Sequence, residues 1–128
     1  MRLRLARTIE IESLSVRYVN EYWSGVTELD GADAEEHWFA VEPEVSIRVM
    51  IWKPKGRGEP FNGTIVMVPG WGSMFEGWRP LVSEWVKSRH LVYIETREKA
   101  SSRINRKISK SDFSIERHSK DIVTVLEI

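Results

Sequence analysis

The feature that most constrains the fold is the apolar run Ile65–Val68, which follows Thr64 without a polar interruption. A short, continuously apolar run predicts a strand covered on both faces, as in a parallel sheet. After a loop at residues 69–77, apolar side chains recur at helical spacing at Trp78, Leu81, Val82, Trp85 and Val86. Residues 91–94 form a second apolar strand. We therefore predict a βαβ unit here, with Pro80 in the first turn of its helix.

A β-hairpin is predicted before this unit. Residues 37–41 are rich in aromatic side chains, and residues 42–44 have the composition of a turn. In residues 45–52, apolar side chains at every second position alternate with Ser46, Arg48, Met50 and Trp52. This period of two is typical of a strand with one buried face. Residues 53–63 are rich in Pro and Gly and are predicted to form a surface loop.

The first 36 residues are predicted to be a helical and loop extension. Leu14, Tyr18 and Tyr22 fall on one helical face, which indicates a helix around residues 10–24. Residues 30–36 are small and acidic, as is typical of an exposed loop. We therefore assign residues 1–36 to this extension and residues 37–128 to an α/β domain.

The last segment predicts a polar loop and a helix. Residues 96–112 are polar, and Ser114 can cap a helix that has Glu116 near its positive end. The helix would bury a stripe made of Ile115, Ile122, Val123 and Leu126. The pattern ends at Ile128 without a helix stop signal, so we expect an incomplete α/β sheet that continues in a longer protein. A naturally small, complete domain is the alternative.

Composition excludes several classes of function. The chain has 19 basic and 19 acidic residues, so no overall charge attracts nucleic acid or an anionic membrane. It has no cysteine, which removes disulfides, thiolate nucleophiles and cysteine zinc sites. No apolar stretch has the length of a signal peptide or a membrane span. We expect a cytoplasmic protein without metal or cofactor, and its oligomeric state is left open.

Chemistry is most clearly indicated by the loop Pro69-Gly70-Trp71-Gly72-Ser73 and the following Gly77-Trp78-Arg79-Pro80-Leu81. Because glycine has no Cβ, it permits positive φ and lets backbone N–H groups approach a ligand closely. This segment resembles the part of α/β-hydrolases in which a buried strand enters a His-Gly-x-Gly loop and then a helix. The resemblance continues in Glu95–Ser102, which is similar to the Asp-x-Arg-Gly-x-Gly-x-Ser loop of that family, and in residues 112–128, which resemble the helix before the nucleophile strand.

The resemblance implies a role for each residue of the glycine loop. The backbone N–H of Trp71 would donate to the oxyanion of a tetrahedral intermediate, while Gly70, Gly72 and Trp71 would bind substrate. The sequence departs from the family at Pro69, where the family has His, and at Glu98 and Ala100, where it has glycines. The second departure implies that this turn is built differently.

The resemblance also implies where the rest of the chemistry lies. No Gly-x-Ser-x-Gly nucleophile motif occurs in the chain, so nucleophile, acid and His would follow Ile128. The expected activity is hydrolysis of small to medium carboxylic esters or thioesters, and the 128-residue chain alone is expected to be inactive. One alternative is a non-catalytic α/β-hydrolase-like binding or regulatory domain. Another is an unrelated α/β module with an anion site in its basic loop.

Several sharper site hypotheses are less favoured than ordinary structural roles. Ser73 lacks an identifiable base and is expected to be a loop serine. The three histidines, His37, His90 and His118, have no metal-ligand spacing, and His118 is expected to lie exposed or at the edge of the core. The acidic residues 30–36 fit no calcium loop. The basic residues of loop 97–110 are expected to be solvated rather than to bind anions, and the Trp71 side chain is a candidate pocket wall.

Overall fold

The computed structural model describes residues 28–56 and 63–127. Along the chain it contains β1 (Ala32–Glu42), β2 (Val45–Pro54), β3 (Ile65–Met67), α2 (Phe75–Trp85), β4 (Leu91–Ile94), β5 (Arg103–Ile104), η1 (Lys110–Phe113) and α3 (Ile115–Leu126). The predicted helix around residues 10–24 lies outside the described part of the chain. Within that part, no helix is long and apolar enough to cross a bilayer.

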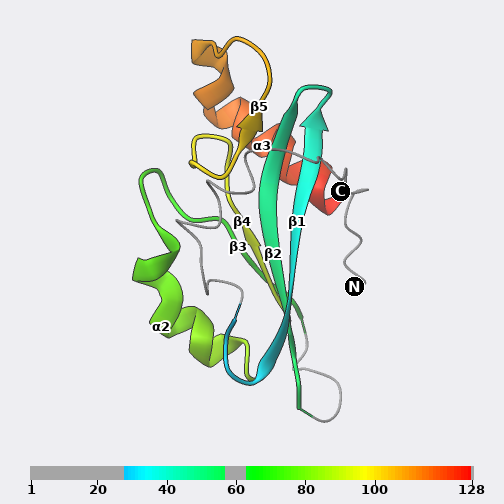
Figure 1. The fold of residues 1–128 in the computed structure, drawn as a ribbon, viewed down its shortest axis with the longest axis vertical. Coiled ribbons are helices and arrows are strands. Elements are labelled where there is room, and N and C mark those ends of the chain that lie inside the picture. The colour runs from blue at the N-terminus through cyan, green and yellow to red at the C-terminus, as the bar shows by residue number, and fades with distance from the viewer. Residues whose placement is uncertain (1–27, 57–62, 128) are drawn as a thin grey trace.

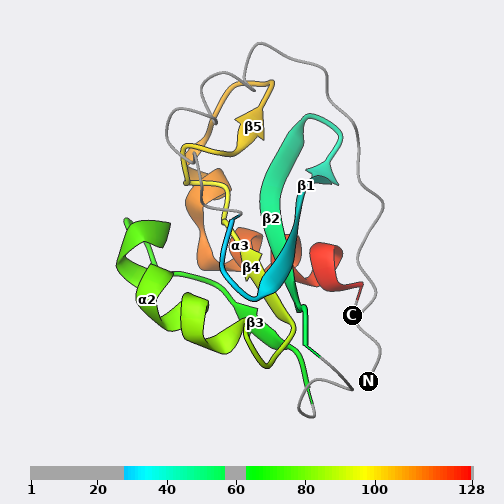
Figure 2. The same cartoon turned by 60° about the horizontal axis from the view of Figure 1, so that its bottom comes forward.

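The strands form one mixed sheet in the order β1-β2-β4-β3, with β5 paired to the start of β2. β1 and β2 form the predicted antiparallel hairpin, and β2 also pairs antiparallel with β4. β3 and β4 pair in parallel and are joined by α2, which confirms the predicted βαβ unit. Two views show α2 and α3 on opposite sides of this sheet (Figure 1, Figure 2).

β1 begins five residues earlier than predicted, because the acidic segment is part of the strand. Asp33 and Glu35 lie near basic side chains, with Glu35 3.1 Å from Lys53 of β2 and Asp33 3.9 Å from Lys55, just after β2. These cross-strand pairs let charged residues occupy an edge strand, a position where charge also discourages pairing with other chains. The prediction of a loop over residues 30–36 is therefore wrong from Ala32 onward.

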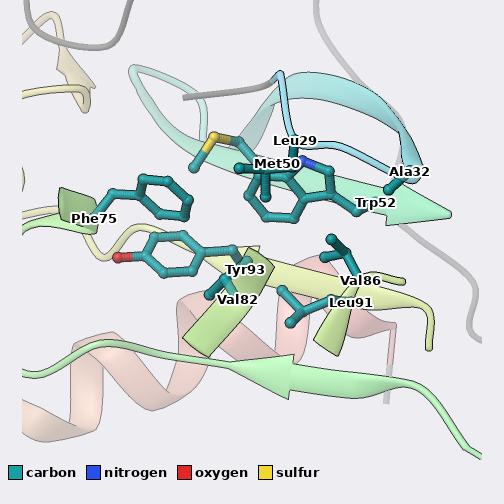
Figure 3. Close-up of a cluster of buried hydrophobic side chains, with 9 residues drawn as sticks. All are labelled: Leu29, Ala32, Met50, Trp52, Phe75, Val82, Val86, Leu91 and Tyr93. Carbon is teal, nitrogen blue, oxygen red and sulfur yellow. The ribbon is translucent and has the colours of Figure 1, made fainter. Parts of the chain in front are cut away.

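β2 is buried on both faces rather than on one. Met50 and Trp52 pack against α2 in the cluster Leu29, Ala32, Met50, Trp52, Phe75, Val82, Val86, Leu91 and Tyr93 (Figure 3). The alternate residues belong to a second cluster, on the α3 side, made of Phe39, Ile47, Val49, Ile51, Val92, Ile94 and Val125. Alternation thus separates two cores, because each face of the strand has its own helix. The polar members Ser46 and Arg48 are buried as well.

β3 is less buried than its apolar run predicts. It lies at the end of the strand order, and Val66 and Val68 are each 39% exposed. Among the described residues, β3 pairs with β4 alone. An edge position explains the exposure, since one side of the strand has no neighbour in this part of the chain.

The two helices have the predicted locations but different buried faces. α2 begins at Phe75, which places Pro80 in the second turn, and it buries Phe75 and Val82 while Leu81 is exposed. Trp78 and Trp85 are partly buried against the α2-side core. In α3, the Ser114 side chain accepts the Arg117 N–H at 3.1 Å, which confirms the predicted cap.

The buried stripe of α3 is His118, Asp121 and Val125, flanked by the partly buried Ile122 and Leu126. Ile115 and Val123, which were expected in the stripe, are exposed. The predicted stripe differs because two of the buried residues are polar: Asp121 binds Arg97, and His118 lies next to Glu98.

Candidate functional site

The glycine turn (residues 70–73) follows β3 and precedes α2. The Ser73 N–H donates to the Gly70 carbonyl at 3.1 Å and closes a four-residue turn. Gly72 has φ +69°, the left-handed conformation that a type II turn requires at its third position. Gly70 does not share this constraint: its φ lies outside the left-handed region, and an added Cβ would stand 3.7 Å from Ser73 Oγ. The expectation of special backbone geometry is confirmed for Gly72 and is wrong for Gly70.

Trp71 occupies the second position of this turn, where a backbone N–H points away from the turn's own hydrogen bond. No described residue accepts a hydrogen bond from its N–H. The side chain is 64% exposed and lies against two rings, edge-on to Phe113 at 6.1 Å between centroids and tilted to His118 at 6.0 Å. The turn therefore presents an N–H donor that has no acceptor in the described part of the chain, next to an aromatic surface.

Lys99, from the second loop (residues 95–102), is hydrogen-bonded to the glycine turn. Its Nζ donates to the Gly70 carbonyl at 2.6 Å and to the Ser73 carbonyl at 3.0 Å, and the residue is 9% exposed. One buried ammonium group thus bonds both ends of the turn. The sequence predicts a solvated Lys99, and this prediction is wrong. Its two acceptors lie 26 and 29 residues away, so no local pattern indicates them.

The neighbouring Glu98 lies next to His118, whose ring contacts the ring of Trp71. Its Oε2 lies 3.4 Å from His118 Nε2, and its Oε1 accepts from Thr96 Oγ1 at 2.7 Å. Both atoms of the Glu98–His118 contact are buried, and neither has a hydrogen-bond partner among the described residues. His118 is 8% exposed, so it lies at the edge of the core, as one of the two expected environments has it. The second loop turns without any positive φ, which agrees with the expectation that it is built differently from a glycine loop.

Two basic residues of loop 97–110, Arg97 and Arg106, belong to an internal ion network, whereas Lys107 and Lys110 are exposed as expected. The six members of this network are Glu42, Arg97, Arg106, Asp112, Arg117 and Asp121. Arg97 is 1% exposed and binds Asp121 through two hydrogen bonds of 2.7 and 2.8 Å. Hydrogen bonds from Arg106 and from the Ser109 N–H hold the pKa of Asp112 well below its usual range. Both the expected solvated loop and the alternative anion site are wrong for Arg97 and Arg106.

A second buried polar group lies behind the second loop. Burial raises the pKa of Glu95, which is 1% exposed and accepts a short hydrogen bond from Ser101 Oγ. Arg48 lies 3.8 Å from this carboxyl group. The Trp38 ring lies under both Arg48 and Arg103, at 5.7 and 4.0 Å from the guanidinium carbons. This group joins the hairpin to the second loop.

An open pocket of about 310 Å³ lies at the second loop. It is lined by Arg97, Glu98, Lys99, Ala100, Ser102, Ile104, Ile108 and Phe113. Trp71 does not line it but contacts Phe113, which does. The aromatic wall of the pocket is therefore Phe113, and Trp71 packs edge-on against that ring.

The remaining candidates do not come together as a site. His37 pairs with Glu35 at 3.1 Å on the surface of β1, and His90 lies just before β4. Ser73 contributes its carbonyl to Lys99. Among residues 28–56 and 63–127, no group of three His, Asp or Glu side chains is arranged to hold a metal ion.

No protein-family model matches the chain, and no curated protein shows significant sequence similarity to it. Its structure is similar to the crystal structure of the Cif epoxide hydrolase from Acinetobacter nosocomialis, with a TM-score of 0.55 at 20% identity. It is also similar to a substituted form of aCif, with a TM-score of 0.54 at 17% identity. Both matches cover 91% of this chain and 34% of the other, so the chain spans about a third of their length. The chain thus has the fold of part of an α/β-hydrolase-type sheet.

Proposed function

We propose that this chain is the N-terminal portion of an α/β-hydrolase that cleaves carboxylic esters or thioesters. The observation that carries the proposal is the glycine turn at the end of β3, in which Gly72 has φ +69° and the Trp71 N–H has no described acceptor. A fixed backbone donor of this kind stabilises a developing oxyanion, and each such donor typically contributes about 3 kcal/mol.

The proposal assigns the covalent chemistry to residues after Ile128. A nucleophile activated by His and an acid would attack the substrate carbonyl, forming a bond to carbon while the carbonyl electrons move to oxygen. The Trp71 N–H would hold that oxygen, and the pocket next to Phe113 would receive a small uncharged substrate group. Gly70, Gly72 and Trp71 are the proposed substrate-side residues, and the proposed location is the cytoplasm.

The test uses the longer protein that contains this chain and compares two glycine substitutions. Gly72→Val forces a β-branched residue into φ +69° and should lower kcat by roughly a hundredfold or more, because the donor is displaced in the transition state. Gly77→Ala, in α2, is the matched control: its Cβ would meet nothing within 4 Å and its φ lies outside the left-handed region, so kcat should change little. Initial rates with one aryl ester, measured over a range of concentrations, separate kcat from KM.

Trp71→Ala completes the comparison because it keeps the backbone N–H. It should change KM and substrate preference more than kcat, since it removes the ring that contacts Phe113. A silent Gly72→Val together with loss of turnover in Trp71→Ala would show that the turn is a binding wall and not an oxyanion donor.

The second candidate is a non-catalytic α/β-hydrolase-like binding domain. It is favoured by the second loop, in which Glu98 and Ala100 stand where the resembled family has glycines, and by Pro69 in place of His. Sequencing the coding region after Ile128 separates the two candidates. A Gly-x-Ser-x-Gly motif in the next strand and turn supports the enzyme, and its replacement supports the binding domain.

A further inference from the structure

We infer that Lys99 is a positioning residue that sets the direction of the Trp71 N–H. This inference rests on the proposed function, because it concerns the same turn. Lys99 is buried, and its ammonium group bonds the carbonyls of Gly70 and Ser73, at 2.6 and 3.0 Å. No other described residue bonds both ends of the turn.

The geometry of one peptide group connects Lys99 to the donor. The Gly70 carbonyl and the Trp71 N–H belong to the same trans peptide, so they point in opposite directions. Lys99 draws the carbonyl inward, toward the second loop, and therefore directs the N–H outward. The Ser73 N–H donates to the same carbonyl at 3.1 Å, which fixes the shape of the turn. Lys99 joins that turn to the second loop.

The residue next to Lys99, Glu98, lies beside the ring that packs against the Trp71 side chain. Glu98 lies 3.4 Å from His118, and the His118 ring contacts the ring of Trp71 at 6.0 Å. Lys99 thus bonds the turn that contains Trp71, while Glu98 lies next to the ring that Trp71 contacts. A donor must be aimed to within a fraction of an ångström to favour a transition state, so the two bonds from Lys99 carry the inference.

The charge of Lys99 is used within the turn. Its Nζ has two carbonyl acceptors and lies 3.4 Å from Glu98 Oε1, so the ammonium is surrounded by oxygen atoms. Lysine has three donors and can satisfy all of these contacts at once. The inference is therefore one of orientation, and Lys99 itself does not contact the substrate.

The first experiment is made on the ¹⁵N,¹³C-labelled 128-residue protein. Hydrogen-bond couplings from Lys99 Nζ to the carbonyl carbons of Gly70 and Ser73 are expected in the wild type, and their absence would overturn the inference without any variant. Lys99→Met should then shift or broaden the Trp71 amide signal, while Lys99→Arg, which can donate to both carbonyls, should largely restore it. Lys120→Met, which removes an exposed lysine from α3, should leave that signal unchanged.

The second experiment measures the same variants in the longer protein. Lys99→Met should lower kcat about tenfold or more with a smaller change in KM, and Lys99→Arg should recover most of the loss. A purely structural role would lower Tm without this split or this recovery. If the Trp71 amide moves but wild-type protein hydrolyses no ester or thioester, the proposed function fails and the positioning role stands. If Lys99→Met leaves the Trp71 amide unmoved, or Lys99→Gln does so where the Met variant does not fold, the inference is wrong.

Discussion

Replacing Arg97 with methionine tests whether the ion network fastens the second loop to α3. The guanidinium donates to Asp121 at 2.7 and 2.8 Å and to Asp112 at 2.7 Å. Methionine keeps much of the length and removes the charge. Asp121, which is 0% exposed, would then retain only the hydrogen bond from Arg117 at 3.3 Å among the contacts described for its carboxylate.

The size of the effect follows from burial. Removing one partner of a buried ion pair typically costs about 3–5 kcal/mol, because the remaining charge is left uncompensated. Asp112 keeps two hydrogen bonds from Arg106, so most of the penalty falls on Asp121. We expect a loss of about 3–4 kcal/mol, or a fall in Tm of roughly 10–20 °C for a domain of this length. The control Lys120→Met, which breaks an exposed pair with Glu116, should leave the unfolding free energy nearly unchanged.

The pH dependence gives the test a sign. The pKa of Asp112 is lowered in the folded state, first by the hydrogen bonds from Arg106, so its contribution is present above the unfolded pKa of about 4 and is lost as pH falls below it. Arg97→Met removes one of the hydrogen bonds that lower the pKa of Asp112. The difference in unfolding free energy between wild type and variant should therefore shrink as pH falls below about 4.

Urea unfolding followed by circular dichroism at several pH values measures this difference directly. A loss below about 1 kcal/mol at pH 7 would refute the reasoning, because typical buried pairs lose several times that amount. A difference that grows on acidification would refute it equally.

Two further results are expected from single substitutions. Val66→Lys should reduce self-association in sedimentation experiments, because β3 has an exposed apolar edge in the described part of the sheet; Val123→Lys on α3 is the control, and a strictly monomeric wild type would contradict this expectation. Ser114→Ala should lower the unfolding free energy by about 1 kcal/mol, since it removes the acceptor of the Arg117 N–H, whereas Ser119→Ala on the exposed face of α3 should have little effect. Equal losses for the two serines would argue against a capping role.

Local patterns were sufficient to predict the hairpin, the βαβ unit and the capped last helix. In each case the signal lies within a few residues: alternation in β2, a continuous apolar run in β4, and Ser114 before α3. Element boundaries and buried faces were predicted less well where distant partners decide them. β1 extends back to Ala32 because residues 32–36 pair with β2, where Lys53 lies near Glu35, and no pattern within residues 30–36 contains that information.

The candidate site shows the same division between local and distant information. The positive φ of Gly72 could be predicted from the spacing of two glycines, since a turn closed by four residues is local. The role of Lys99 could not, because its acceptors come from another βα connection. Arg97 was misjudged for a similar reason: its carboxylate partners lie between 15 and 55 residues away. Counting charges within loop 97–110 found only Glu98 and missed all of them.

The second loop departs from the resembled family at Glu98 and Ala100, and Lys99 between them makes the contact with the glycine turn. A glycine at position 98 would have no side chain to reach His118, yet Glu98 approaches its Nε2 at 3.4 Å while Lys99 reaches the Gly70 carbonyl at 2.6 Å. The loop forms its turns without positive φ, so glycine is not required there and side chains can be accommodated. Side chains of this loop can therefore bond the turn that contains Trp71, as Lys99 does. These bonds suit a turn whose N–H donor must keep one orientation. The second loop is thus part of the candidate site, together with the two glycines.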